Sequence, residues 1–242
     1  MLNDPRSRRQ YRQVADQIML LVAGQGLGPG QRLPSERDLA ERLGVSRPSL
    51  REALIALEVE GQVEIRMGSG IYLLRPGHEG AAGVLHADAE SPMELLEARC
   101  IIESTIAEQV AVLVTPDLIA ALDDNLQQMA AAMDRTPLAI RIDAGFHDLI
   151  ASGLGNSLLS GLVAQIFQKR LTPIFARYSA HFEGPRTWRE ALAEHRLIRD
   201  ALAARDPAAA GAAMRHHLTQ SQRRFNENVL GEQAEHAILQ DD

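Results

Sequence analysis

Two residues that can bind a metal or transfer a proton, Asp143 and His147, stand four positions apart in the largely apolar stretch IDAGFHDLI, residues 142–150. On an α-helix this spacing stacks both side chains on one face. Such a pair is a surface pair, a hydrogen-bonded pair in the core, or half of a metal site. The stretch itself leaves all three interpretations open, so other residues must decide between them.

Histidine supplies further candidate ligands, because three of the eight histidines fall in amphipathic segments beside apolar residues. They are His147, His195 and His217, and each alone is more typical of a hydrogen-bonded core histidine than of a ligand. Together with Asp143 they put four donors on three inward-facing helices, which favours a metal site inside a helical bundle. From spacing alone, His216 fits as well as its neighbour His217.

The donor set of one carboxylate and three imidazoles is intermediate in softness. It suits a divalent transition metal, zinc first and nickel, iron, manganese or copper next, rather than calcium or magnesium. With neutral imidazoles, a divalent ion would leave this cluster with a net positive charge. An ion with open coordination positions would therefore attract an anion.

A second chemistry lies nearer the N-terminus, where Arg47 and Arg51 share a helical face and Ser49 is close by. Helix N-termini offer free N–H groups to phosphate, and arginine binds both phosphate and the O6/N7 edge of guanine. The alternative is a solvated charged face. The elements around the two arginines favour DNA over that alternative.

Those elements follow the pattern of a winged helix-turn-helix. Ser35 caps a short helix that Gly44 ends, and Ser46 caps a second helix with a stripe of buried leucines. The stretch VEIRMGSGIYLL, residues 63–74, then predicts a strand, a turn and a strand. The tip of this wing, residues 68–70, carries little side chain and is able to approach a DNA backbone closely.

The rest of the chain predicts helices without strands. Breakers divide it into six amphipathic segments, and the segment 156–182 contains Pro173, which should kink it. We therefore expect a mainly α protein. Its parts are a winged-helix DNA-binding domain at residues 1–75, a Gly/Ala-rich linker at 76–91 and an all-α six-helix bundle at 92–235.

Composition narrows the class further. A single cysteine, Cys100, excludes an internal disulfide and favours a reducing compartment, and no apolar run is long enough to span a bilayer. We therefore expect a cytoplasmic protein. The formal net charge of −7 divides into +2 for residues 1–75 and −9 for the remainder, so only the first part suits a polyanion.

The segment LPSERDLAERLGVSRPSLREALIALEVEGQVEIRMGSG, residues 33–70, resembles the winged-helix domain of the GntR family of bacterial transcription regulators. The resemblance implies that three arginines contact operator phosphates and bases, that two serines assist them, and that one glycine lies at the wing tip in or over the minor groove. These residues are Arg37, Arg47, Arg51, Ser46, Ser49 and Gly68. Residues 53–72 look most like the regulators of hexuronate and sugar-acid catabolism within the family.

The motifs DAGFH, EH and MRHHL, in that order along the helical part, resemble the FCD ligand-binding domain of the FadR branch of that family. In the family pattern the last ligand stands three residues after the methionine, which implies His217 rather than His216. The metal ligands that the resemblance implies are Asp143, His147, His195 and His217.

The same resemblance implies an effector-binding role for Arg99, on the first helix of the helical domain. A guanidinium beside a cationic metal is a natural clamp for a carboxylate. The alternative for Arg99 is a surface ion pair with Glu97 or Glu103.

Taken together, these features predict a metabolite-responsive transcription repressor rather than an enzyme. It would act as a homodimer on palindromic operator DNA and respond to a small carboxylate, most readily a sugar acid. A lactate-like hydroxy acid or a dicarboxylate is the next alternative, and the metal set argues against an acyl-CoA sensor. A metal-dependent hydrolase or lyase with a DNA-binding module is more distant, because no H-E-x-x-H motif, nucleophile elbow or phosphate loop occurs in the sequence.

Overall fold

The computed structural model describes residues 10–66, 68–75, 91–170 and 172–227. These residues divide between two compact units, of which the second is formed by residues 94–225. The linker expected at residues 76–91 lies outside the described residues except for Ser91. Among the described residues, no helix is long and apolar enough to cross a membrane.

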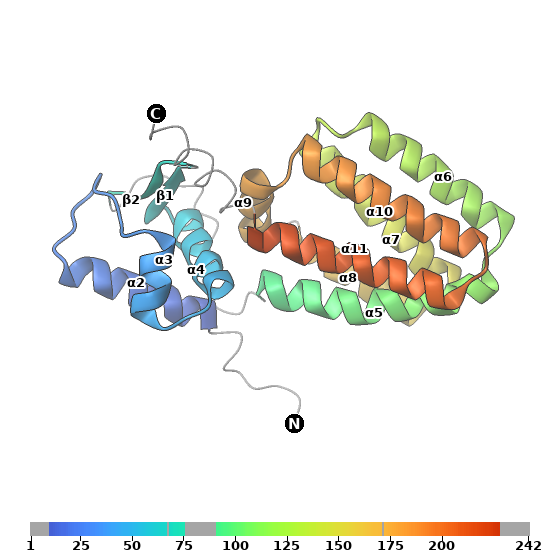
Figure 1. Cartoon of the computed structure of the whole chain (residues 1–242), viewed down its shortest axis with the longest axis horizontal. Helices are drawn as coiled ribbons and strands as arrows, with labels where there is room; N and C mark the ends of the chain where they lie inside the picture. The colour runs from blue at the N-terminus through green and yellow to red at the C-terminus, as the bar shows by residue number, and fades with distance from the viewer. Residues whose placement is uncertain (1–9, 67, 76–90, 171, 228–242) are drawn as a thin grey trace, which may run out of the picture. The chain divides into compact units, whose positions relative to one another are not determined.

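The N-terminal unit contains three helices followed by a two-stranded sheet (Figure 1). The helices are α2 (Gln10–Gly24), α3 (Glu36–Leu43) and α4 (Arg47–Val59), and the strands are β1 (Val63–Arg66) and β2 (Gly70–Leu73). The strands pair antiparallel, so that Val63 faces Leu73 and Arg66 faces Gly70. This is the winged helix-turn-helix that the sequence predicts.

Local chemistry sets the limits of α3 and α4. The hydroxyl of Ser35 accepts a hydrogen bond from the amide of Asp38, and that of Ser46 accepts one from the amide of Ser49. Gly44 ends α3 in the left-handed region at φ 66°, where a residue without Cβ is favoured. The leucine stripe expected on α4 is buried against α2 and α3, with Leu50, Leu54 and Leu57 all at most 2% exposed.

The C-terminal unit is all helical over its described residues. Its helices are α5 (Pro92–Leu113), α6 (Pro116–Ala131), α7 (Thr136–Gly153), α8 (Ser157–Lys169), α9 (Pro173–Phe182), α10 (Pro185–Ala203) and α11 (Pro207–Glu227). Most run alongside one another, while α9 lies across one end of the bundle (Figure 1). The core between them includes Leu122, Phe146, Ile150, Ile198 and Met214.

The expected six helices are seven among the described residues, because one predicted kink is a complete break. Thr172 has the extended conformation and Pro173 is the first residue of α9. A residue before proline avoids the helical region of φ/ψ space. Proline also has no N–H to donate to the carbonyl four residues earlier, so a helix does not continue through it without losing that hydrogen bond. The segment 156–182 therefore forms α8 and α9 rather than one bent helix, and the sequence prediction was wrong on this point.

Candidate functional site

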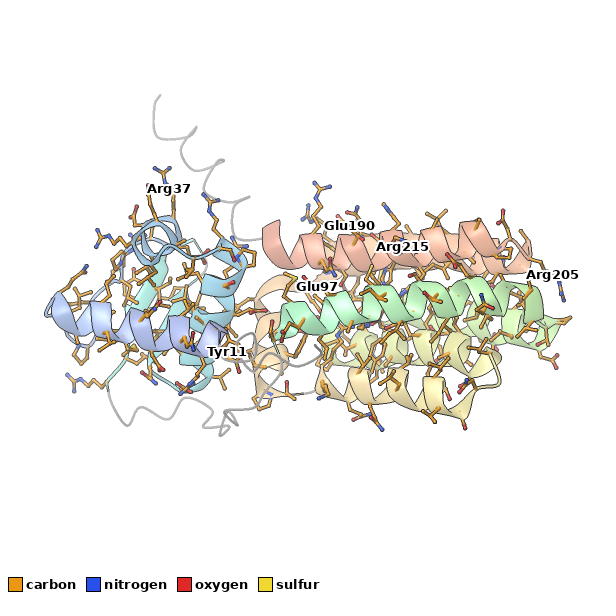
Figure 2. The ribbon with its side chains drawn as sticks, turned by 90° about the horizontal axis from the view of Figure 1, so that it is seen from below. Tyr11, Arg37, Glu97, Glu190, Arg205 and Arg215 are labelled. Atoms are coloured by element: carbon orange, nitrogen blue, oxygen red, sulfur yellow. The ribbon has the colours of Figure 1, made fainter. Side chains whose placement is uncertain are left out.

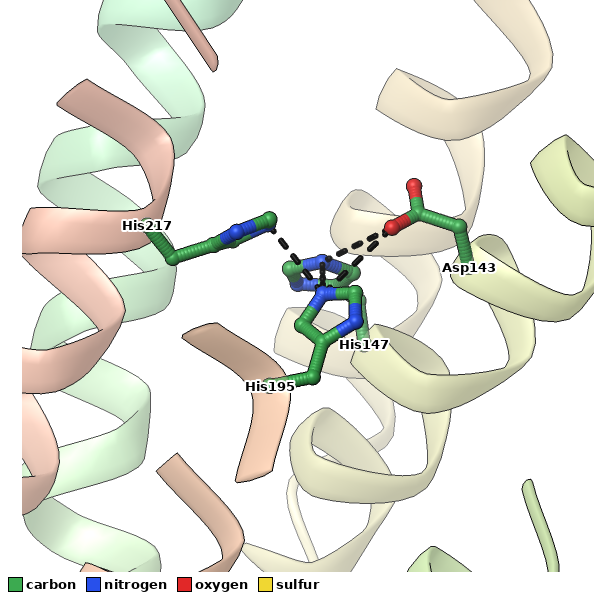
Figure 3. Close-up of side chains that lie close together, drawn as sticks. All are labelled: Asp143, His147, His195 and His217. Atoms are coloured by element: carbon green, nitrogen blue, oxygen red, sulfur yellow. Dashed lines mark hydrogen bonds and ion pairs between the residues drawn. The ribbon is translucent and has the colours of Figure 1, made fainter. Parts of the chain in front are cut away.

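Three helices of the C-terminal unit bring four donor side chains to one point in the core (Figure 3). Helix α7 contributes Asp143 and His147 from successive turns, α10 contributes His195, and α11 contributes His217. All four are at most 4% exposed. Their facing atoms all lie within 4.8 Å of one another. His216, the alternative that spacing left open, is exposed to solvent.

The atoms that meet at this point are one nitrogen from each imidazole and one carboxylate oxygen. Nε2 of His195 lies 3.3 Å from Nε2 of His147 and 3.2 Å from Nε2 of His217. Oδ1 of Asp143 lies 3.4 Å from Nε2 of His195 and 3.7 Å from Nε2 of His147. Distances of this size are those between ligands that share one metal ion.

The outer nitrogen of each imidazole lies close to a side chain of another helix. Nδ1 of His147 lies 2.5 Å from Oε2 of Glu103, and Nδ1 of His217 lies 2.8 Å from Oε2 of Glu194. Nδ1 of His195 instead faces the sulfur of Met129 at 3.3 Å. A carboxylate that accepts at Nδ1, as Glu194 does for His217, favours the tautomer in which Nε2 is a lone-pair donor.

With Nε2 of each imidazole unprotonated, three lone pairs and a carboxylate oxygen would converge at this buried point and repel one another unless a cation lay between them. The donor set therefore fits a metal ion, and it fits badly with a network of ordinary hydrogen bonds. Once bound, such an ion would supply a positive centre with coordination positions for an anion.

The pKa directions in the cluster agree with neutral imidazoles at two positions. Burial and neighbouring histidines hold the pKa values of His195 and His217 well below the ordinary value. Burial also acts to lower the pKa of His147, but Glu103 and Asp143 together outweigh it and raise that pKa. For Asp143, burial is opposed by His147 and Arg170, and its pKa falls well below the ordinary value. A carboxylate is therefore ionised at the cluster.

A cavity opens beside the cluster and is rich in arginine. Its volume is about 40 Å³. Its lining consists of Arg99, Asp143, Arg170, Glu183, Thr187, Trp188, Ala191, His217, Ser221 and Arg224. Since Asp143 and His217 belong to both, the cavity and the donor cluster share a wall.

Each of the three arginines in this wall is held by a carboxylate. Arg170 donates to Asp143 at 2.7 Å and to Glu183 at 3.0 Å. Arg224 donates hydrogen bonds to both carboxylate oxygens of Glu194, at 2.6 and 2.9 Å. These pairs fix the guanidinium groups in place, and they extend the charge network from the cluster to the cavity.

Arg99 is only 1% exposed and its Nε donates to Oε1 of Glu103 at 2.7 Å. Its guanidinium lies over the ring of Phe167, 4.1 Å from the centroid. The sequence left a surface ion pair as the alternative to a pocket role. Arg99 does pair with Glu103, but the pair is buried and the arginine also lines the cavity.

The residues that the sequence associates with DNA lie on α3, α4 and the wing. Arg37 and Arg47 are exposed, and the side chain of Arg37 projects away from α3 (Figure 2). Arg51 differs, because it is 3% exposed and its Nε donates to Oε2 of Glu36 at 2.9 Å. Gly68 lies in the wing turn with a positive φ of 69°.

The two serines of this set make contacts within the protein at the start of α4. The hydroxyls of Ser46 and Ser49 are 2.8 Å apart, and Ser46 caps α4. Ser46 is exposed and Ser49 is half-buried. Both therefore stand at the N-terminus of α4, where free N–H groups favour a phosphate.

Sequence reasoning missed the outer residues of the metal cluster and most of the cavity. Glu103 entered only as an ion-pair partner for Arg99, and Glu194 only as the residue before His195. Helical spacing could have revealed Glu103, since it follows Arg99 by four residues on one face of α5. Arg170 and Arg224 come from helix ends far away in the chain, and no local signal marks them.

Comparison with known proteins agrees with this architecture. A family model described as "Bacterial regulatory proteins, gntR family" matches residues 10–73, and a model of the FCD domain matches residues 94–220. The Uxu operon transcriptional regulator of Escherichia coli K12 is 36% identical over 229 residues, which are 91% of this chain and 88% of that protein. This chain belongs to the GntR family of bacterial regulators.

Two further relatives of this GntR-family chain cover most of its length. The Exu regulon transcriptional regulator of Escherichia coli K12 is 37% identical, over 87% of this chain and 82% of that protein. A protein of the same organism named "Putative L-lactate dehydrogenase operon regulatory protein" is 31% identical, over 96% of this chain and 92% of that protein. Family membership confirms a DNA-binding transcription regulator rather than an enzyme.

Proposed function

We propose that this regulator holds a divalent transition metal at Asp143, His147, His195 and His217 and binds a small carboxylate, a sugar acid, in the adjacent cavity. Effector binding weakens operator binding by a homodimer, so that the protein acts as a repressor. One observation carries the proposal. Four buried donor atoms converge on one point, and that point lies in the wall of an arginine-lined cavity.

The charge of the site supports an anionic effector only when the metal is present. The three arginines of the cavity are matched by four carboxylates, namely those of Asp143, Glu103, Glu183 and Glu194. With neutral histidines this leaves an excess of one negative charge, which a divalent ion converts into an excess of one positive charge. A monocarboxylate should therefore bind the metal-loaded protein and avoid the metal-free protein.

The metal that the donors suit best is zinc, with nickel, manganese or iron as alternatives. Imidazole and carboxylate are intermediate ligands that these ions share. The outer carboxylates of Glu103 and Glu194 make two of the imidazoles stronger donors, as is usual around a protein-bound transition metal.

DNA binding would use the exposed residues of α3, α4 and the wing. Arg37 and Arg47 are free of the core, and Ser46, Ser49 and Gly68 stand at the helix N-terminus and the wing turn. A symmetric pair of such units suits a palindromic operator. Since effector and operator then couple through one equilibrium, each must weaken the binding of the other by the same factor.

The class of effector rests on likeness to other regulators. Residues 53–72 resemble the regulators of hexuronate and sugar-acid catabolism, and the Uxu and Exu regulators are similar along most of the chain. The relative named for an L-lactate dehydrogenase operon supports a lactate-like hydroxy acid as the second candidate. A dicarboxylate is the third.

Calorimetric titration tests the proposal directly. The zinc-loaded protein is titrated with glucuronate, gluconate, lactate and succinate, and each titration is repeated after treatment with a chelator. We expect a sugar acid to bind with the highest affinity, and we expect chelation to abolish that binding. Equal binding before and after chelation would refute the metal-linked site, and preference for lactate or succinate would replace the sugar acid by that class.

A further inference from the structure

Two residues of the cavity lining each carry a polar atom that is not used by the donor cluster or by the arginines. Nε1 of Trp188 and Oε2 of Glu183 are both buried, and neither has a hydrogen-bond partner among the residues that the structure describes. A buried donor or acceptor without a partner destabilises the folded protein. Unsatisfied groups in the wall of a ligand cavity therefore suggest what the ligand itself supplies.

The indole of Trp188 is fixed by apolar packing rather than by a hydrogen bond. The side chain is 4% exposed and forms a small cluster with Ala139 and Ala191, against which Met133 and Ile140 also pack. Helix α10 starts one turn earlier, so the backbone at this position is firmly held. The ring is positioned, and only its N–H remains without a partner.

The second group comes from the same junction between α9 and α10. Glu183 is the C-terminal cap of α9, and its Oε1 accepts a hydrogen bond from Arg170 at 3.0 Å. This contact holds the carboxylate beside the cavity, while Oε2 is buried without a hydrogen-bond partner among the described residues. Glu183 and Trp188, both in the cavity lining, thus carry one unpaired acceptor and one unpaired donor only five residues apart.

A hydroxyl group complements this combination, because it both donates and accepts. A second carboxylate has no proton to donate to Oε2 and would meet the negative charge of Glu183. An unsubstituted methylene chain would leave both protein groups unsatisfied. The chemistry of the two open groups therefore distinguishes hydroxylated acids from dicarboxylic acids and from plain fatty acids.

We propose that Trp188 and Glu183 form a hydroxyl-recognition subsite, which makes the cavity selective for monocarboxylic acids with several hydroxyl groups. The proposal rests on the function proposed above, since it assumes that a carboxylate occupies the cavity. The metal and Arg99 would bind the carboxylate of the acid, and the subsite would form hydrogen bonds with its hydroxyl groups. Sites built to bind a hydroxyl reject analogues that lack it, since the protein groups are then left unpaired.

The test compares acids that differ in their hydroxyl groups and keep the same carbon framework. Gluconate is paired with hexanoate, and glucuronate is paired with tetrahydropyran-2-carboxylate. The full-length zinc-loaded protein is used throughout. Trp188 is the only tryptophan of the chain, so its fluorescence reports directly from the cavity of the wild-type protein. Calorimetry measures affinity for every variant.

The variants remove one polar function each and retain most of the shape. Trp188→Phe keeps an aromatic ring and removes the N–H, while Glu183→Gln removes the charge. Glu97→Gln, at an exposed position of α5, is the matched control for the second change. We expect each cavity variant to weaken binding of the preferred hydroxylated acid about tenfold and to leave the deoxygenated partner within about twofold. Bound zinc, measured by elemental analysis, should remain as in the wild type.

Three outcomes would overturn the subsite, and they are distinguishable from one another. Equal weakening of both members of a pair, or no weakening of either, leaves a carboxylate site without hydroxyl recognition. Binding of hexanoate as tightly as gluconate by the wild type, together with equal binding of the two ring acids, has the same meaning. If the zinc-loaded wild type binds no member of either pair, the proposed carboxylate function fails as well. Should Trp188→Phe not fold, Glu183→Gln decides alone.

Discussion

The two units of this regulator build their functional surfaces in opposite ways. The residues associated with DNA lie within 32 positions of one another, from Arg37 to Gly68, and several are exposed. The proposed metal donors span 75 positions, from Asp143 to His217, and all are buried. The first set needs only a capped helix and a turn to be placed, whereas the second exists only when three helices pack together.

A substitution that impairs function should therefore affect stability little in the N-terminal unit and strongly in the C-terminal unit. An exposed arginine on a recognition helix contributes little to folding, so its loss should change binding and leave the unfolding temperature as it was. A buried donor that faces other donors contributes to packing and, through the metal proposed above, would also contribute to the free energy of folding. Arg51 is intermediate, because it belongs to the DNA-associated set but is buried against Glu36.

Removing two of the metal donors gives the largest expected effect. We expect His147→Ala combined with His195→Ala to reduce bound metal from about one ion per chain to nearly none, because only two donors would remain. Elemental analysis of the purified protein measures this. The matched control is His216→Ala, which changes the exposed neighbour of a donor and should retain the ion. Full metal content in the double variant would mean that the donors are elsewhere.

Substitution of the recognition-helix arginines tests the exposed surface. We expect Arg47→Ala to weaken binding to DNA selected by the wild type from a random library by about 5- to 150-fold, because a good arginine–base contact is worth about 1–3 kcal/mol. Its unfolding temperature and effector affinity should not change. Arg51→Ala should lose DNA affinity and also unfold at a lower temperature, since it leaves the Glu36 carboxylate without this partner.

The control for these two changes is Arg42→Ala, at an exposed position of α3 that is not assigned to DNA. If Arg47→Ala retains its DNA affinity, the assignment of α4 as the recognition helix is wrong. If Arg51→Ala is as stable as the wild type, the buried contact between Arg51 and Glu36 does not stabilise the fold, and Arg51 behaves like the exposed arginines.

Changing Arg99 should affect the effector more than the metal. We expect Arg99→Ala to weaken binding of the preferred acid about tenfold, since a charge-assisted hydrogen bond to a carboxylate would be lost. Zinc affinity should fall less, although Glu103 loses a partner. Arg99→Lys keeps the charge beside Glu103 and separates the two effects. An unaltered titration of Arg99→Ala with the acid would show that Arg99 acts only within its ion pair.

Acid should destabilise the C-terminal unit through Glu103, with a smaller effect than the substitutions above. Burial alone would raise the pKa of Glu103, but Arg99 and His147 outweigh it and lower that pKa to about 2. A carboxyl whose pKa is lower in the folded state adds stability above its ordinary pKa, and this contribution is lost as the pH falls toward the folded-state value. We therefore expect metal-free wild type to lose stability more steeply than metal-free Glu103→Gln between about pH 5 and about pH 2.

Thermal unfolding of both proteins across this range measures the difference. The stability advantage of the wild type should narrow as the pH falls, because the amide that replaces the Glu103 carboxylate in the variant does not titrate, while Asp143 is common to both. Parallel curves for the two proteins would show that Glu103 is not held ionised by Arg99 and His147.

Local rules were sufficient to predict the N-terminal unit. Serines at helix starts and the glycine at the end of α3 act on backbone groups within a few residues. The helix limits at Ser35, Gly44 and Ser46 can therefore be predicted without knowledge of tertiary contacts. The burial of Arg51 was not predicted, because its pairing with Glu36 depends on how α3 and α4 cross. The break at Pro173 was underestimated as a kink, since sequence alone does not tell whether neighbouring helices hold a bent segment together.

In the C-terminal unit, spacing and resemblance named the four donors, but not the groups that orient them. Met129 is an ordinary apolar residue by sequence, and only the packing of α6 against α10 brings its sulfur to Nδ1 of His195. Arg170 and Arg224 look like surface residues near helix ends. They become cavity residues because Asp143 and Glu194 lie within hydrogen-bond distance of them.

The sequence by itself determined the two kinds of unit, the helix limits of the winged domain and the types of ligand available for a metal. These depend on interactions between residues close in the chain, which are the same wherever the segment lies. Only the tertiary structure decided which polar groups share a cavity, which arginines are buried, and that Trp188 and Glu183 have open hydrogen-bonding atoms there. The physical reason is that burial and pairing depend on distances across the bundle, which spacing along a single helix does not contain.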